Sequence, residues 1–220
     1  MAYRRTAGVI RRMAERHDTI VMAAEAVAGE GGMAAVQIAA VADRAGIAAG
    51  TVYRYFPGKT DLVGALVARV CEAEHAAMHG AAQAAPGPLS ALAAGFAAFG
   101  TRALSRRRLI WAVLGEPVEP EIEAPRLDYR RAFAAEIEDR IAAAIAGGHL
   151  PEQDPALAAA ALFGGLLEGL VGPLSRSADA DPARAREMVQ ELTLLALRGL
   201  GMVDARARGL IAASPPQANH

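Results

Sequence analysis

Apolar residues recur every three or four positions along most of the chain, which is the spacing of one face of an α-helix. A first helical run is expected from Asp18-Thr19 to the glycine cluster at 29–32, followed by two short segments at 36–46 and 48–56. Each short segment has only about three turns or fewer, so it needs a packing partner to be stable. A long helix is then expected from Thr60-Asp61 to about His79.

Five more helices are predicted after the break at 84–88, over residues 88–104, 106–115, 125–147, 154–174 and 181–201. Stretches rich in glycine, proline or charged residues separate them. The pattern is lost after Met202, and the tail at 203–220, which contains Ser214-Pro215-Pro216, is expected to be disordered. The sequence therefore predicts an all-α chain, in which a three-helix N-terminal unit precedes a six-helix C-terminal body.

Composition supports this fold class. The chain is 53% hydrophobic but only 5% aromatic, because alanine, the best helix former, is by far the most common apolar residue. The most apolar stretch, 156–174, contains Glu168 and many small residues, which favours a buried helix over a membrane span. The first residues lead into polar sequence, so we expect no secretory signal, no membrane partner and a cytoplasmic location.

The net charge of −1 conceals an asymmetry between the two ends of the chain. Residues 1–60 carry eight basic and five acidic side chains, and the only lysine, Lys59, lies among them. A basic N-terminal region indicates a nucleic-acid partner. Within the basic arm at 1–17, the arginines at positions 4, 5, 11 and 12 could embrace DNA, and a solvated tail is the alternative.

The two short segments and the turn between them describe a helix-turn-helix unit. Gly46 permits the left-handed backbone that the turn needs, and Val52 and Phe56, four residues apart, form an inward face. The second helix is short enough to lie in the major groove. Candidate DNA contacts are Gln37, Ala48, Thr51, Tyr53, Arg54, Tyr55 and Lys59.

The string from Val41 to Leu62 closely resembles the N-terminal DNA-binding domain of TetR/AcrR-family transcriptional regulators. The resemblance covers roughly residues 18–66 and lies in Ala45-Gly46, then Gly50-Thr51-Val52-Tyr53-Arg54-Tyr55-Phe56, then Lys59 before a long helix. It implies a DNA-binding domain at 18–60 and an effector-binding and dimerisation domain at 61–202. The implied function is that of a homodimeric repressor, released from a palindromic double-stranded DNA operator by a small organic effector.

The chain departs from the family pattern at the start of both short helices. Gln37 and Ala48 stand where family members usually carry Ser or Thr, so two helix caps are lost. Ala39 and Ala49, which the resemblance places against DNA, cannot hydrogen-bond to bases, so specificity is expected to rest partly on DNA shape. The missing caps also leave open an alternative, a helical small-molecule-binding or interaction protein without DNA binding.

Larger apolar and aromatic residues gather on the four helices between 88 and 174, where we expect a pocket for an apolar or amphipathic effector. A packed core is the alternative for each of them. The candidate pocket residues are Phe96, Phe99, Trp111, Tyr129, Arg130, Phe133, Leu162 and Leu166. The neighbouring Arg126 and Arg131 could, with Arg130, hold an anionic group or simply form a solvated face.

The last two helices of the body carry stripes of small residues with leucines among them, a pattern that allows close helix pairing. We expect Leu166, Leu170, Leu192 and Leu195 to form the interface of a homodimer. Cys71, His75 and His79 share a helix face, but the first and last are about 12 Å apart along the axis, so no metal site or cofactor is predicted. No phosphate-binding glycine loop or hydrolase motif is present, so we expect no enzymatic activity.

Overall fold

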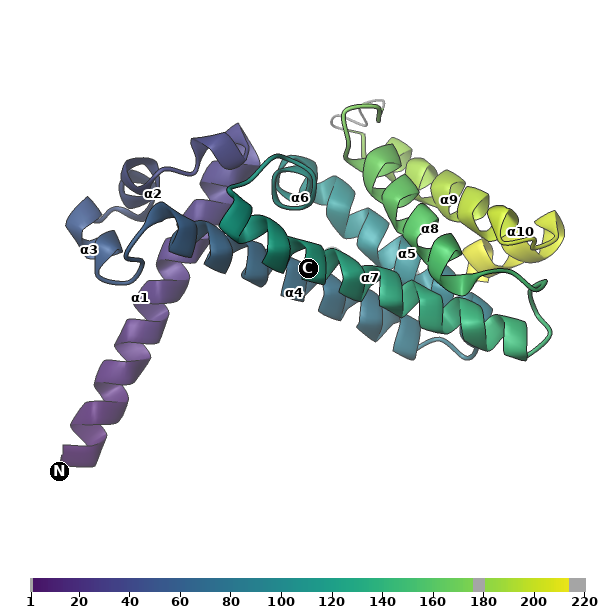
Figure 1. Ribbon diagram of the computed structural model, residues 1–220, viewed down its shortest axis with the longest axis horizontal. Coiled ribbons are helices and arrows are strands. Elements are labelled where there is room, and N and C mark those ends of the chain that lie inside the picture. The colour runs from purple at the N-terminus through teal and green to yellow at the C-terminus, as the bar shows by residue number, and fades with distance from the viewer. Residues whose placement is uncertain (1, 176–180, 214–220) are drawn as a thin grey trace. The chain divides into compact units, whose positions relative to one another are not determined.

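The computed structural model describes residues 2–175 and 181–213, with side chains from residue 8 to 175 and from 181 to 212. This part of the chain is all-α, as predicted: it forms ten α-helices and one short 3-10 helix, without a strand (Figure 1). The contacts divide the chain into two compact units. The head unit is Met1–Val70 with Arg108–Arg126, and the body unit is Cys71–Arg107 with Leu127–His220.

The head unit is built on the C-terminal half of one long helix. Its elements are α1 (Ala2–Gly31), η1 (Met33–Ala35), α2 (Ile38–Ala45), α3 (Ala49–Tyr53), the start of α4 (Lys59–Gln83), most of α6 (Arg107–Leu114) and the start of α7 (Pro120–Ala146). Ile20, Ala24 and Ala28 of α1 are fully buried, at the spacing of one helix face. Val41 of α2 and Val52 of α3 are also fully buried in this unit.

The start of α1 differs from the expectation. The helix begins at Ala2, not at Asp18, so the basic arm is helical and projects beyond the other elements of the head in Figure 1. Thr19, at the expected start of the helix, donates its hydroxyl back to the carbonyl of Glu15 over 2.7 Å. This back-bonding is compatible with an uninterrupted helix, so the polar pair lies inside α1.

The body unit is formed by the rest of α4 and α7 together with α5 (Pro88–Ser105), α8 (Pro155–Leu170), α9 (Pro182–Gly199) and α10 (Asp204–Ala213). Asp154 and Asp181 cap α8 and α9 by accepting hydrogen bonds from backbone amides in the first turn of each helix. The core includes stacked and edge-on contacts among Phe99, Phe133 and Phe163.

Other predicted elements also differ from the structure. The expected disordered tail contains α10, so among the described residues the helices number one more than the nine predicted; residues 214–220 lie outside the described part. Helix α7 begins at Pro120, and Pro125, which had marked its start, lies inside it. Helix α8 ends at Leu170, four residues early. None of the described helices is long and apolar enough to span a bilayer.

Candidate nucleic-acid interface

The turn between α2 and α3 has the left-handed residue that the sequence predicts. Gly46 adopts φ 65° and ψ 36°, and its amide bonds to the last carbonyls of α2. The amide of Ile47 donates to the carbonyl of Ala42 over 3.0 Å, which completes the hydrogen bonding at this helix end. The left-handed glycine thus ends α2 and redirects the chain into α3.

Helix α3 is held by its inward side chains and presents small and polar groups outward. Val52 is fully buried and Phe56 is 3% exposed, as predicted for the inward face. Tyr53 is 54% exposed and Arg54 is exposed beside it. Thr51 and Tyr55 are half-buried, and residues 48–50, Ala-Ala-Gly, are exposed. Backbone at these three positions can therefore approach a ligand closely.

Both short helices lack side-chain caps, which confirms the expected loss. Gln37 and Ala48 occupy the two N-cap positions in extended conformations, and neither makes a side-chain cap bond. The Gln37 amide nitrogen donates instead to the carbonyl of Ala34 over 3.0 Å. Its side chain is exposed, so it is available to a partner in the same region as α3.

Lys59, the candidate phosphate contact at the first residue of α4, is engaged within the head. Its Nζ lies 2.8 Å from Oε1 of Glu119, the residue before α7. The hydrogen bond from Lys59 holds the pKa of Glu119 below its usual value. At the same helix start, the Asp61 carboxylate accepts the Gly58 amide over 2.9 Å. Sequence reasoning identified Lys59 but gave no sign of its carboxylate partner sixty residues away.

A second carboxylate fixes the α6–α7 connection to the entrance of the helix-turn-helix. Glu116 accepts the backbone amide of Met33 in η1 over 2.7 Å, and its other oxygen accepts from Arg108. Its carbonyl accepts from Arg126, which is buried. No local pattern could have indicated this contact, because 83 residues separate Glu116 from Met33.

From Val9 to His17 the basic arm is exposed on all sides of its helix. Arg11, Arg12 and Arg16 are exposed, and Arg11 forms a 3.5 Å ion pair with Glu15. Where the arm joins the head, the His17 ring packs on Phe56 with centroids 4.8 Å apart. The side chains of the arginines at positions 4 and 5 lie outside the described part of the chain.

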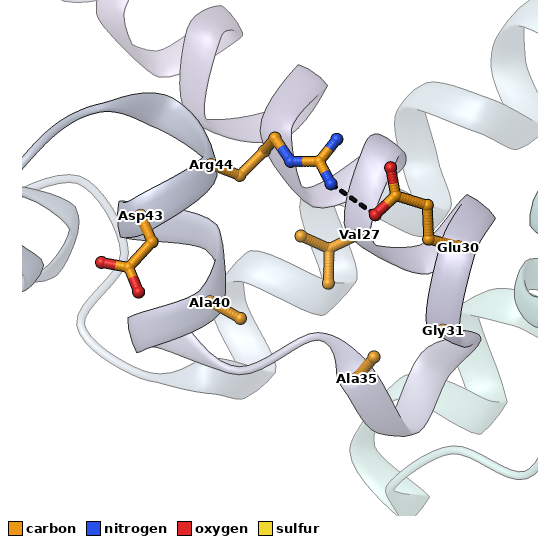
Figure 2. Close-up of a pocket in the computed structure, with 7 residues that line it drawn as sticks. All are labelled: Val27, Glu30, Gly31, Ala35, Ala40, Asp43 and Arg44. Carbon is orange, nitrogen blue, oxygen red and sulfur yellow. Dashed lines mark hydrogen bonds and ion pairs between the residues drawn. The ribbon is translucent and has the colours of Figure 1, made fainter.

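A shallow pocket of about 590 Å³ opens between the end of α1 and α2. Figure 2 shows Arg44 of α2 and Glu30 of α1 pointing toward each other across it, joined by an ion pair. This pair lowers the pKa of Glu30. Small residues form much of the remaining lining, which comprises Val27, Gly31, Ala35, Ala40 and Asp43. None of the residues that line the pocket belongs to α3, and the sequence did not predict the pocket.

The predicted effector residues are distributed over both units. Trp111 belongs to the head unit, whereas the other seven belong to the body unit. Phe96, Phe99 and Phe133 are at most 1% exposed and pack in the body core, as the core alternative predicts. Arg130 and Leu162 are half-buried.

Tyr129 is half-buried and donates its hydroxyl to Glu72 over 3.1 Å. Burial is the main cause that raises the pKa of Tyr129 above its usual value, and the hydrogen bond to Glu72 is the second cause.

Two of the four predicted interface leucines are buried inside the protomer. Leu166 is 4% exposed and Leu170 is not exposed at all, so neither can add much area to a contact between subunits. Leu192 is half-buried and lies over Gly169 of α8. Leu195 is 63% exposed on the outer face of α9.

The shared helix face of Cys71, His75 and His79 is occupied by contacts inside the body. Cys71 is buried, the His75 ring meets Phe133 edge-on, and His79 hydrogen-bonds Glu136 over 2.8 Å. Across the described residues, no group of three or more His, Cys, Asp or Glu is placed to hold a metal ion.

Residues 20–66 match the family described as bacterial regulatory proteins, tetR family. Over 49 residues the chain is 55% identical to the HTH-type transcriptional repressor KstR of Mycobacterium tuberculosis, an alignment that covers 22% of each protein. The chain thus aligns with about a fifth of the length of this curated relative.

Solved structures share the fold over most of the chain. The fatty acid degradation regulator FadR from Bacillus halodurans superposes with a TM-score of 0.74 at 21% identity, covering 86% of this chain and 97% of that one. RolR in complex with resorcinol gives 0.64 at 21% identity, covering 94% and 98%. At these identities the likeness shows the fold alone.

Proposed function

The chain belongs to the TetR family of bacterial regulatory proteins, and on this premise we propose that it is a ligand-responsive, homodimeric transcriptional repressor. The observation that carries the proposal is the outward face of α3: exposed Ala-Ala-Gly backbone followed by Tyr53 and Arg54, anchored by the buried Val52. This is a short helix built to approach a groove and to donate hydrogen bonds at its edge.

The contacts of each residue follow from its position. Tyr53 and Arg54 are exposed donors suited to backbone phosphates, which fix the position of the protein on DNA but carry no sequence information. Thr51, Tyr55 and Gln37 can donate to base edges, and the methyl groups of Ala48 and Ala49 suit thymine methyls. Because base-reading donors are few, specificity depends partly on the shape of the operator.

Release requires that an effector bind one state of the protein better than the other. Helices α4 and α7 each contribute residues to both units, so either can transmit a change in the body to the head. An apolar or amphipathic effector suits a body whose larger side chains are mostly apolar. The half-buried Tyr129, Arg130 and Leu162 are the candidates that an entering molecule can reach.

In a homodimer, the head units of the two protomers would match the two half-sites of a palindromic operator. We place the contact between protomers on the outer faces of α8 and α9, where Leu157 and Leu195 are 69% and 63% exposed. Gly165 is exposed on α8, and a Cβ added to it would meet no heavy atom within 4 Å. This position therefore leaves room for a facing helix.

The deciding experiment is titration of the purified chain against DNA upstream of its own gene, followed by fluorescence anisotropy at several salt concentrations. We expect specific binding whose affinity falls steeply with salt, and weaker binding for Arg54→Ala. Arg206→Ala is the matched control, because Arg206 is an exposed arginine on α10 of the body. Absence of binding to every fragment at low salt would favour the alternative of a binding protein that does not contact DNA.

A further inference from the structure

The ion pair between Lys59 and Glu119 lies at the amino end of α4, the helix that follows the helix-turn-helix unit. Lys59 is the first residue of α4, and its Nζ lies 2.8 Å from Glu119 Oε1. The two side chains are 32% and 36% exposed, so an incoming anion can reach them. The amino end of a helix and a lysine together attract a negatively charged oxygen.

Glu119 is held there by its neighbours. Three residues before it, Glu116 accepts the Met33 amide at the entrance of the helix-turn-helix. Three residues after it, Ile122 is buried, and its Cδ1 lies 3.5 Å from the Cβ position of Gly64 on α4. These contacts hold the chain on both sides of Glu119 and so keep this residue near the start of α4.

A carboxylate and a DNA phosphate are both anionic oxygen acceptors, so they compete for the same ammonium group. We propose that Glu119 sets the operator affinity of the head by occupying Lys59 in the free protein and yielding it to a backbone phosphate on binding. The proposal rests on the DNA-binding function above. It assigns to Glu119 a positioning role through Lys59, without a contact to DNA of its own.

Three variants separate this competition from a general effect of charge. Glu119→Gln keeps the shape and removes the charge. We expect its operator dissociation constant to fall by about three- to tenfold, and the slope of log K against log salt to steepen by about 0.9 for one added phosphate contact. This gain in affinity depends on Lys59. The double variant Lys59→Gln/Glu119→Gln should therefore bind the operator no more tightly than the single variant Lys59→Gln. Because phosphate contacts carry no sequence information, non-operator DNA should gain by the same factor.

The matched control is Glu121→Gln, an exposed acid in the first turn of α7 whose loss changes the net charge equally. We expect its affinity and salt slope to stay at the wild-type values. Glu119→Asp keeps the charge but shortens the side chain by one methylene, so it should tighten binding less than Glu119→Gln. Melting curves of all variants establish that each one is folded.

The proposal is overturned if Glu119→Gln binds with the wild-type affinity and slope, or binds more weakly. It is also overturned if the gain persists without Lys59, or if Glu121→Gln shows the same gain. These outcomes leave the proposed function intact, because the wild-type chain still binds its operator. Failure of the wild-type chain to bind any DNA overturns both proposals together.

Discussion

Replacing Gly46 with alanine tests the turn on which the position of α3 depends. Gly46 has φ +65°, a conformation that costs a residue with a Cβ about 1–2 kcal/mol. A Cβ at this position would have no heavy atom within 4 Å, so no steric term adds to the conformational one. We therefore expect Gly46→Ala to lower the unfolding free energy by about 1–2 kcal/mol, or the melting temperature by about 2–8 °C.

Two further variants make the test specific to backbone conformation. Asparagine tolerates the left-handed region better than alanine, so Gly46→Asn should lose less stability. Gly80 lies inside α4, where a Cβ also meets nothing within 4 Å and φ is negative. There the same added methyl should raise the stability by up to about 1 kcal/mol, because alanine favours a helix over glycine.

The assay is urea unfolding followed by circular dichroism, with operator binding measured on the same preparations. The opposite signs at positions 46 and 80 are the essential result. If Gly46→Ala proves neutral or stabilising, or if both substitutions destabilise equally, the cost does not come from the left-handed turn. The account of how α2 and α3 are joined would then be wrong.

Three other predictions follow from single contacts. Glu116→Ala should lower the unfolding free energy by about 2 kcal/mol, because the backbone amide of Met33 loses a charged acceptor. Glu116→Gln should lower it less, because the glutamine side chain still offers a neutral oxygen acceptor. Urea titration measures both changes. Since burial and then Glu72 raise the pKa of Tyr129, the stability from this group is present below pH ~10 and is lost as the pH rises past the folded pKa. Absorbance titration should show a late-ionising tyrosine that is missing from Tyr129→Phe. Leu195→Glu should shift sedimentation from dimer toward monomer, whereas the control Val203→Glu, at an even more exposed residue in the loop before α10, should not.

The elements that the sequence predicts correctly are those with local signals. The left-handed turn needs Gly46, and the buried pair Val52 and Phe56 follows from their spacing on adjoining turns. The missing caps at Gln37 and Ala48 follow from the identity of one side chain each. Each of these features depends on residues within a few positions of one another, which a sequence pattern can show.

The features that sequence reasoning missed depend on distant contacts or on the orientation of a helix. Glu116 lies 83 residues from its partner Met33, and Glu119 lies 60 residues from its partner Lys59. No repeated spacing in the sequence links either pair. Leu170 and Leu195 share the same composition pattern, yet one packs in the protomer core and the other faces outward. Only the packing of α8 and α9 decides which face of each helix is free.

The cations near α3 differ in how available they are to DNA. Arg44 is paired with Glu30 and Lys59 with Glu119, whereas Arg54 on the end of α3 is exposed. Because the outward face of α3 offers few donors to bases, phosphate contacts must supply a large share of the binding free energy. A carboxylate that competes for a phosphate-binding cation therefore affects the affinity more than it would in a head with many base contacts. Glu119 is the acid expected to have this effect, because its partner Lys59 lies at the amino end of a helix, which favours a phosphate.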